Sequence, residues 1–141
     1  RVVVDARGRC PRIARLFTDT VRHRTIVFTT PQSSAAWRRC LVLRGIIVIV
    51  VPGKRGRVDV RAALRELGRM DVTSVLVEGG GELLGSMFDA RLVDKVVFFY
   101  APIIIGGRDA TTAVAGDGVA KVAHALRLQA KPWVVEASVR Q

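Results

Sequence analysis

The chain has 141 residues, of which 50% are hydrophobic, 25% charged and 6% aromatic, a composition typical of one globular domain rather than of a disordered or fibrous chain. Its longest apolar runs, 46–51 and 96–100, have the length of strands and fall short of the roughly 18 residues that a membrane span needs. Residues 1–7 lack the apolar stretch and cleavage site of a secretory signal. We therefore expect a soluble cytoplasmic protein with no membrane partner.

The formal net charge of +11 is unevenly distributed, because residues 1–70 hold 16 of the 23 basic and only 4 of the 12 acidic side chains. Such a surplus is typical of proteins that bind nucleic acid or a small phosphorylated ligand, and a bias in codon usage would also produce it. The basic residues are scattered and aromatic residues are few, whereas single-strand binders combine a basic groove with aromatic platforms. We do not expect nucleic acid as a partner.

Cysteine and histidine patterns indicate no metal and no disulfide scaffold. Cys10 and Cys40 have no CxxC partner, and His23 and His124 lie far apart without an HxxxH or HExxH spacing. No Ser-His-Asp or Cys-His arrangement is visible either, so we assign no catalytic nucleophile and predict no metal site.

In chain order, β-branched runs alternate with segments of helical period in the first half of the sequence. The apolar runs predict strands at 2–4, 25–30 and 46–51. Between and after them we expect a short helical turn around Ile13, Leu16 and Phe17, a helix that Ser33 or Ser34 caps and that runs toward Gly45, and a helix from the Asp59 cap to Gly68.

The second half predicts further strands. A strand over 74–78, a glycine turn and a helix through Phe88 are followed by a strand over 92–100, and 109–119 has the composition of a surface loop. The tail alternates like a hairpin over 125–129 and 134–139. This order predicts one α/β domain over residues 1–141, with a mostly parallel central sheet and antiparallel C-terminal edge strands.

The glycine turn, Gly79-Gly80-Gly81, is the segment that most strongly suggests a ligand. Glycines let the backbone approach a ligand closely, and the helix that follows offers free N–H groups to an anion such as phosphate. The spacing matches neither GxGxxG nor a P-loop, so a tight turn without a ligand stays an alternative. Glu78 ends the predicted strand at the edge where open α/β sheets bind ligands; it would accept hydrogen bonds from ribose hydroxyls or a heterocycle amino group, or cap nearby N–H groups.

These residues carry a family resemblance. The segment 77–86, followed by Leu92-Val93-Asp94-Lys95, Ala101-Pro102 and Gly106-Gly107, resembles the reductase domain of the bifunctional riboflavin-biosynthesis deaminase/reductase, and Val2-Val3-Val4-Asp5 resembles that domain's strand with its terminal aspartate. The resemblance implies a dihydrofolate-reductase-like three-layer fold and a homodimer. It also implies NADPH-dependent reduction of a phosphorylated ribosylaminopyrimidine, 5-amino-6-(5-phosphoribosylamino)uracil, to the ribitylamino product.

The resemblance further implies roles for individual residues. The family's substrate-contacting glutamate falls on Glu78, and its cofactor-binding segment falls on Gly80, Gly81, Glu82, Leu83, Leu84, Gly85 and Ser86. Ala6 replaces a small hydroxyl residue that contacts the cofactor in the family, so that contact would use the backbone. Arg7 and Arg9 follow, and either one would pair with the 2′-phosphate that distinguishes NADPH from NADH, or would be an exposed turn arginine.

One departure concerns the start of the chain. The family has a leading segment with a lysine, a tryptophan-bearing turn and an Ala-Asp-Asp-Pro loop, and residues 1–141 begin after it. We expect a single reductase-like domain that is incomplete at its N-terminus and weakly active by itself. Two alternatives stay open. One is a related reductase acting on a pteridine or an unphosphorylated pyrimidine, and the other is a non-catalytic basic module for binding or assembly.

Overall fold

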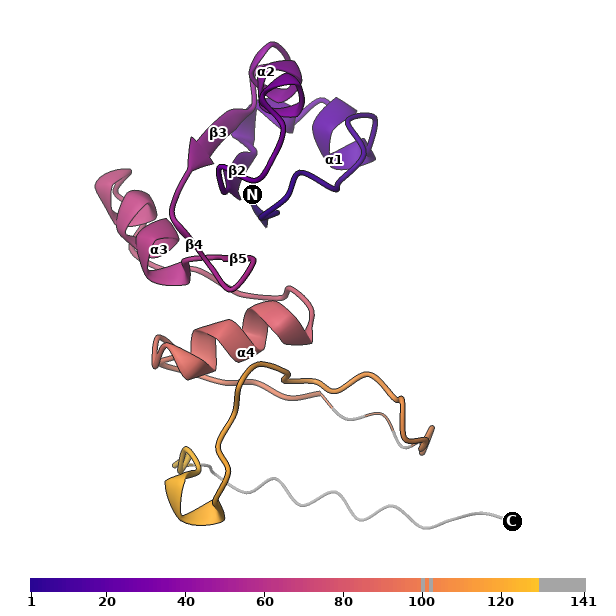
Figure 1. Ribbon diagram of the computed structural model, residues 1–141, viewed down its shortest axis with the longest axis vertical. Helices are drawn as coiled ribbons and strands as arrows, with labels where there is room; N and C mark the ends of the chain where they lie inside the picture. Colours follow the sequence, from indigo (N-terminus) through magenta and orange to yellow (C-terminus); the bar gives the residue numbers. More distant parts are fainter. Residues whose placement is uncertain (100, 102, 130–141) are drawn as a thin grey trace. The chain divides into compact units, whose positions relative to one another are not determined.

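The computed structural model describes residues 1–99, 101 and 103–129 (Figure 1). The chain divides into two compact units, Arg1–Val75 and Leu76–Gln141, which we describe separately. The expectation of one domain over the whole chain stays a prediction.

The first unit is built on a parallel sheet of three strands, β1 (Val2–Val4), β2 (Ile26–Thr29) and β3 (Ile47–Val50), in the order β1-β2-β3 (Figure 1). Their β-branched side chains suit a pleated sheet that is covered on both faces. All three strands lie where the sequence predicts them. The predicted second and third strands are each one residue longer at both ends than the observed ones.

Helices cover one face of this sheet. The single turn α1 (Arg15–Thr18), the 3-10 helix η1 (Arg22–Arg24) and α2 (Ala35–Val42) follow β1 and β2. The core on this side consists of Phe17, Val27, Trp37, Leu41 and Ile46. The predicted cap of α2 is confirmed at Ser34, whose Oγ accepts a hydrogen bond from the Trp37 N–H at 3.1 Å.

The other face packs against α3 (Val60–Arg69). The core here consists of Phe28, Val51, Val58, Ala62, Ala63 and Leu67. The Asp59 carboxylate caps α3 by accepting from the N–H groups of Arg61 at 2.9 Å and Ala62 at 3.1 Å, as the sequence predicts. The unit therefore has a helix layer, a parallel sheet and a second helix layer, which confirms the predicted α/β class and is consistent with a dihydrofolate-reductase-like domain.

A small hairpin joins β3 to α3 and was not predicted. Strands β4 (Gly53–Lys54) and β5 (Arg57–Val58) pair antiparallel. The two residues between them, Arg55 and Gly56, have φ values of 51° and 75°. A two-residue turn with positive φ at both positions is the type I′ geometry that matches the twist of a hairpin.

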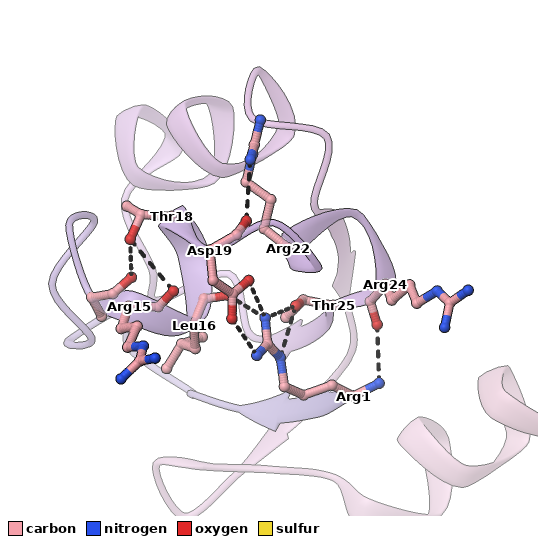
Figure 2. A network of polar contacts seen from close by, with 9 residues as sticks. Arg1, Arg15, Leu16, Thr18, Asp19, Arg22, Arg24 and Thr25 are labelled. Atoms are coloured by element: carbon pink, nitrogen blue, oxygen red, sulfur yellow. Dashed lines mark hydrogen bonds and ion pairs between the residues drawn. The ribbon is translucent and has the colours of Figure 1, made fainter.

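The Arg1 side chain ties the start of β1 to the end of α1 (Figure 2). Its guanidinium donates to both carboxylate oxygens of Asp19, at 2.9 and 3.1 Å, to the Leu16 carbonyl at 2.6 Å, and to Thr25 Oγ1 at 2.8 and 3.0 Å. This bidentate pair raises the pKa of Arg1 above its usual value and lowers that of Asp19.

The second unit contains the helix α4 (Gly81–Asp89) and the 3-10 helix η2 (Val122–His124). The helix predicted after the glycine turn is thus confirmed, and 109–119 is irregular, as expected for a loop.

The predicted strands of the second half are not found. Residues 74–78, 92–99 and 125–129 form no strand, while Tyr100 and 134–139 lie outside the described residues. A strand needs a partner for its ladder of hydrogen bonds, and an apolar run by itself indicates only extended backbone. Among the described residues these runs leave side chains such as Leu76 and Phe99 largely exposed.

No helix in the described part of the chain is long and apolar enough to cross a membrane.

Candidate functional site

The N-terminus of α4 presents an open backbone at Gly80. This residue is the N-cap of α4 and provides no side-chain cap, and its carbonyl accepts from the N–H groups of Leu83 at 3.0 Å and Leu84 at 3.3 Å. A Cβ on Gly80 would have no atom within 4 Å. The N–H groups of a first helical turn lack partners within the helix and carry the positive end of its dipole. An anion thus has both a binding group and an approach at Gly80.

Two other glycines of the predicted segment have a packing role. A Cβ on Gly81 would lie 2.7 Å from the Thr112 carbonyl oxygen, and a Cβ on Gly85 would lie 2.1 Å from the Ala115 carbonyl oxygen. The Ala115 N–H also donates to the Gly81 carbonyl at 3.0 Å. Gly81 and Gly85 are four residues apart and so share one face of α4. The 112–116 loop packs against that face.

Asp89, the last residue of α4, binds the backbone just after this loop. Its carboxylate accepts from the Asp117 N–H at 2.7 Å and from the Gly118 N–H at 3.1 Å. Sequence reasoning missed this residue, because its partners lie 28 and 29 residues further along the chain and no local pattern connects them.

The remaining residues of the segment have contacts within the turn and helix. Leu83 Cδ2 lies 2.8 Å from the place of a Cβ on Gly79, and Ser86 Oγ donates to the Glu82 carbonyl at 2.8 Å; Leu84 is half-buried. Glu82 is exposed in the first turn of α4. A carboxylate only accepts hydrogen bonds, so Glu82 would contact a phosphate through its backbone N–H.

Glu78 is exposed and lies in irregular backbone two residues before Gly80. The prediction that it ends a strand is therefore wrong. Glu78 immediately precedes the glycine turn in the sequence, and its role toward a substrate stays a prediction.

Ala6 and Arg7 belong to the first unit, where they follow β1. The Asp5 carboxylate shapes this turn by accepting from the N–H groups of Arg7 at 3.3 Å, Arg9 at 3.1 Å and Cys10 at 2.8 Å. The Ala6 carbonyl accepts from Thr30 Oγ1 at 2.7 Å. Thr30 is buried, and the sequence alone did not reveal this contact with Ala6.

Within the described ranges, no group of three or more His, Cys, Asp or Glu side chains is placed to hold a metal ion.

Comparison with known proteins gives the family. The RibD C-terminal domain family matches residues 1–136. The chain belongs to this family. A 2,5-diamino-6-ribosylamino-4(3H)-pyrimidinone 5′-phosphate reductase of Methanothermobacter thermautotrophicus is 40% identical over 131 residues, which are 93% of this chain and 58% of the relative. A reductase of the same name from Archaeoglobus fulgidus is 37% identical over 86% of this chain and 53% of its own length.

A relative of a different name also matches. The riboflavin biosynthesis protein RibD of Actinobacillus pleuropneumoniae is 30% identical over 93% of this chain but only 35% of its own length. The chain thus spans between about a third and three fifths of the curated relatives named above. The resemblance to a riboflavin-biosynthesis reductase domain is confirmed.

Proposed function

We propose that this chain is the nucleotide-binding part of a riboflavin-biosynthesis reductase, which reduces the ribose of a phosphorylated ribosylaminopyrimidine to the ribityl form. The observation that carries the proposal is the uncapped start of α4 with open space at Gly80, in a member of the RibD C-terminal domain family. Hydride transfer needs orientation and charge from the protein rather than a nucleophile. That requirement suits a chain in which we assign no nucleophile.

The cofactor in this proposal is NADPH. The α4 start offers a place for the pyrophosphate of a nicotinamide dinucleotide, because the space beside Gly80 is open and the N–H groups of a first helical turn favour an anion. Reduced nicotinamide, when bound, supplies the hydride that the ribose carbon accepts. The cofactor-binding segment of this proposal continues through Glu82, Leu83, Leu84, Gly85 and Ser86. Ala6 and Arg7, which belong to the first unit, are proposed as cofactor contacts on the family resemblance alone.

Glu78 would orient the substrate. Its exposed carboxylate precedes the glycine turn and accepts hydrogen bonds from hydroxyl or amino groups, both of which a ribosylaminopyrimidine carries. Two pyrimidines are candidates. The resemblance implies 5-amino-6-(5-phosphoribosylamino)uracil, and the names of the two archaeal relatives favour the 2,5-diamino pyrimidinone.

A titration of the purified chain with NADPH and NADH, followed by nicotinamide fluorescence and thermal shift, tests the cofactor. Both pyrimidines, each with and without its phosphate, then test the substrate by NADPH oxidation. We expect saturable cofactor binding and turnover only of phosphorylated pyrimidines. Absence of binding at millimolar cofactor would overturn the proposal, and binding of DNA or RNA that falls steeply with salt would favour a basic binding module instead.

Glu78→Gln separates the substrate role from the cofactor role. We expect a higher KM for the pyrimidine and an unchanged Kd for NADPH, because the amide keeps the size of the side chain and removes its charge. Asp94→Asn is the matched control, since Asp94 is also an exposed carboxylate in this unit.

The proposal includes a homodimer, as the family resemblance implies, in the cytoplasm. Sedimentation equilibrium of the purified chain tests the dimer.

A further inference from the structure

The 112–116 loop contacts α4 near both ends of the helix. Near the start, the Ala115 N–H donates to the carbonyl of Gly81, the first residue of α4, at 3.0 Å. Near the end, a Cβ on Gly116 would lie 2.6 Å from Oδ2 of Asp89, the last residue of α4. One loop thus connects the two ends of this helix through space.

Both carboxylate oxygens of Asp89 bind the backbone that follows this loop. Oδ2 accepts from the Asp117 N–H at 2.7 Å, and Oδ1 accepts from the Gly118 N–H at 3.1 Å. Gly116 and Gly118 have positive φ values of 98° and 60°. Successive N–H groups in such a turn form a concavity that binds an anion, and here the anion is the carboxylate of the chain itself.

The charge of Asp89 does not serve the helix that carries it. A carboxylate at the C-terminus of a helix is repelled by the negative end of the helix dipole. The hydrogen-bond donors of Asp89 lie 28 and 29 residues further along the chain, outside α4. These contacts therefore connect Asp89 with the loop rather than with the stability of the helix.

The same loop borders the start of α4. The Thr112 carbonyl oxygen lies 2.7 Å from the position of a Cβ on Gly81, whereas a Cβ on Gly80 would have no atom within 4 Å. Of these two neighbouring glycines, one is thus covered by the loop and the other is open. A displacement of the loop would change both the hydrogen bond to the Gly81 carbonyl and the side from which a ligand reaches the first helical turn.

We propose that Asp89 is a positioning residue for the cofactor. It fixes the 112–116 loop against α4, and the loop in turn holds the start of the helix in the arrangement that binds a pyrophosphate. This inference rests on the proposed function, in which the α4 start binds the pyrophosphate of a nicotinamide dinucleotide. Asp89 acts through the backbone and does not contact the cofactor. Since NADPH and NADH share the pyrophosphate, Asp89 affects the binding of both equally.

The test uses the full chain and three variants. Asp89→Ala removes both acceptor oxygens, and Asp89→Asn keeps one of them. Met87→Val is the matched control for lost stability, because it shortens a buried side chain of α4 that lies two residues from Asp89 and so on another face of the helix.

Two quantities are measured at a temperature at which all variants are folded. Fluorescence titration gives the Kd values for NADPH and NADH. Amide hydrogen exchange, followed by NMR, reports the N–H groups of Ala115, which donates to Gly81, and Leu83, which donates to Gly80. The exchange measurement needs no ligand, so it tests the positioning of the loop and of the helix start independently of cofactor binding.

We expect Asp89→Ala to speed exchange at Ala115 and Leu83 and to raise both Kd values about 3- to 10-fold, a change of the size that one hydrogen bond contributes. Asp89→Asn should have a smaller effect on each quantity, and Met87→Val should leave both Kd values unchanged.

Unchanged exchange at Ala115 in Asp89→Ala would overturn the inference. Equal rises in Kd for Met87→Val and Asp89→Ala would also overturn it, because lost stability alone would then weaken binding. If the parent chain binds both cofactors and the Asp89 variants bind them equally well, only this inference fails. If the parent chain binds neither cofactor, the proposed function fails and the inference fails with it.

Discussion

The Ala115 carbonyl oxygen lies 2.1 Å from the position that a Cβ on Gly85 would take. Non-bonded atoms do not approach so closely, so α4 and the 112–116 loop can pack together only because residue 85 is a glycine. The glycine that looks like part of a cofactor motif in the sequence is therefore also a packing residue.

Gly85→Ala should destabilise the chain. The added methyl group displaces backbone at Ala115, and such overpacking costs about 1–3 kcal/mol, more than the roughly 0.5–1 kcal/mol that alanine gains in a helix. Urea unfolding followed by far-UV circular dichroism measures the change. Gly68→Ala is the matched control, because Gly68 is also helical and a Cβ there has no neighbour within 4 Å. It should stabilise, and a loss at both sites would contradict the packing argument.

Gly80→Asp should separate stability from cofactor binding. An aspartate at the N-cap accepts hydrogen bonds from the first turn and should stabilise α4 by up to about 1 kcal/mol. Its charge repels a phosphate at the same place, so the Kd for NADPH should rise at least about tenfold. Thermal shift without ligand and fluorescence titration measure the two effects. A more stable variant with unchanged cofactor affinity would remove the α4 start from the binding site.

Asp19 should make stability depend on acid pH. The Arg1 guanidinium beside it lowers the pKa of this carboxyl, so the pair stabilises the folded chain above the unfolded pKa of about 4. That contribution is lost as the pH falls from about 4 through the lower, folded pKa. Asp19→Asn should flatten the acid limb of the urea midpoint plotted against pH, whereas Asp94→Asn should preserve it. An unchanged acid limb in Asp19→Asn would mean that other carboxyls set it.

The pKa of the Cys10 thiol should depend on the charge of Asp5. Partial burial, and then the Asp5 charge, raise the pKa of Cys10 above its usual value. Removing the charge in Asp5→Asn should lower that pKa and speed alkylation of Cys10 at mildly alkaline pH. The rate of iodoacetamide labelling against pH, in a Cys40→Ala background, measures this. A midpoint that does not move would show that burial alone sets the pKa.

Thr30→Val should lower the free energy of unfolding, because the Thr30 hydroxyl binds the backbone at Ala6. The substitution leaves the Ala6 carbonyl without the Thr30 hydroxyl and should cost about 1–2 kcal/mol in unfolding free energy. Thr18→Val is the control, because Thr18 is exposed and its hydroxyl lies 3.4 Å from its helical acceptors. Similar losses for both variants would assign the effect to the threonine hydroxyl in general rather than to the contact with Ala6.

Local patterns were sufficient for much of the fold. The strands at β1, β2 and β3, the caps Ser34 and Asp59, and the helix after the glycine turn were all predictable, because each depends on neighbours within a few residues. The β4–β5 hairpin was not, since strands of two residues have no measurable period and its turn places an arginine at positive φ.

The apolar runs at 74–78 and 92–99 show that composition alone does not predict whether a segment pairs as a strand. Their residues favour extended backbone, but pairing requires a partner strand, and that choice is made between segments distant in the sequence.

The same division holds for the candidate site. The sequence alone determined the α/β class, the helix behind the glycine turn and the family resemblance, because motifs and periodicity are local. Tertiary structure decided that Gly81 and Gly85 pack against the 112–116 loop. It also decided that the Asp89 carboxylate accepts a hydrogen bond from a backbone N–H 28 residues further along the chain, and that Arg7 lies against Gly56. These contacts join residues far apart in the chain, and only the folded backbone brings them within reach of each other.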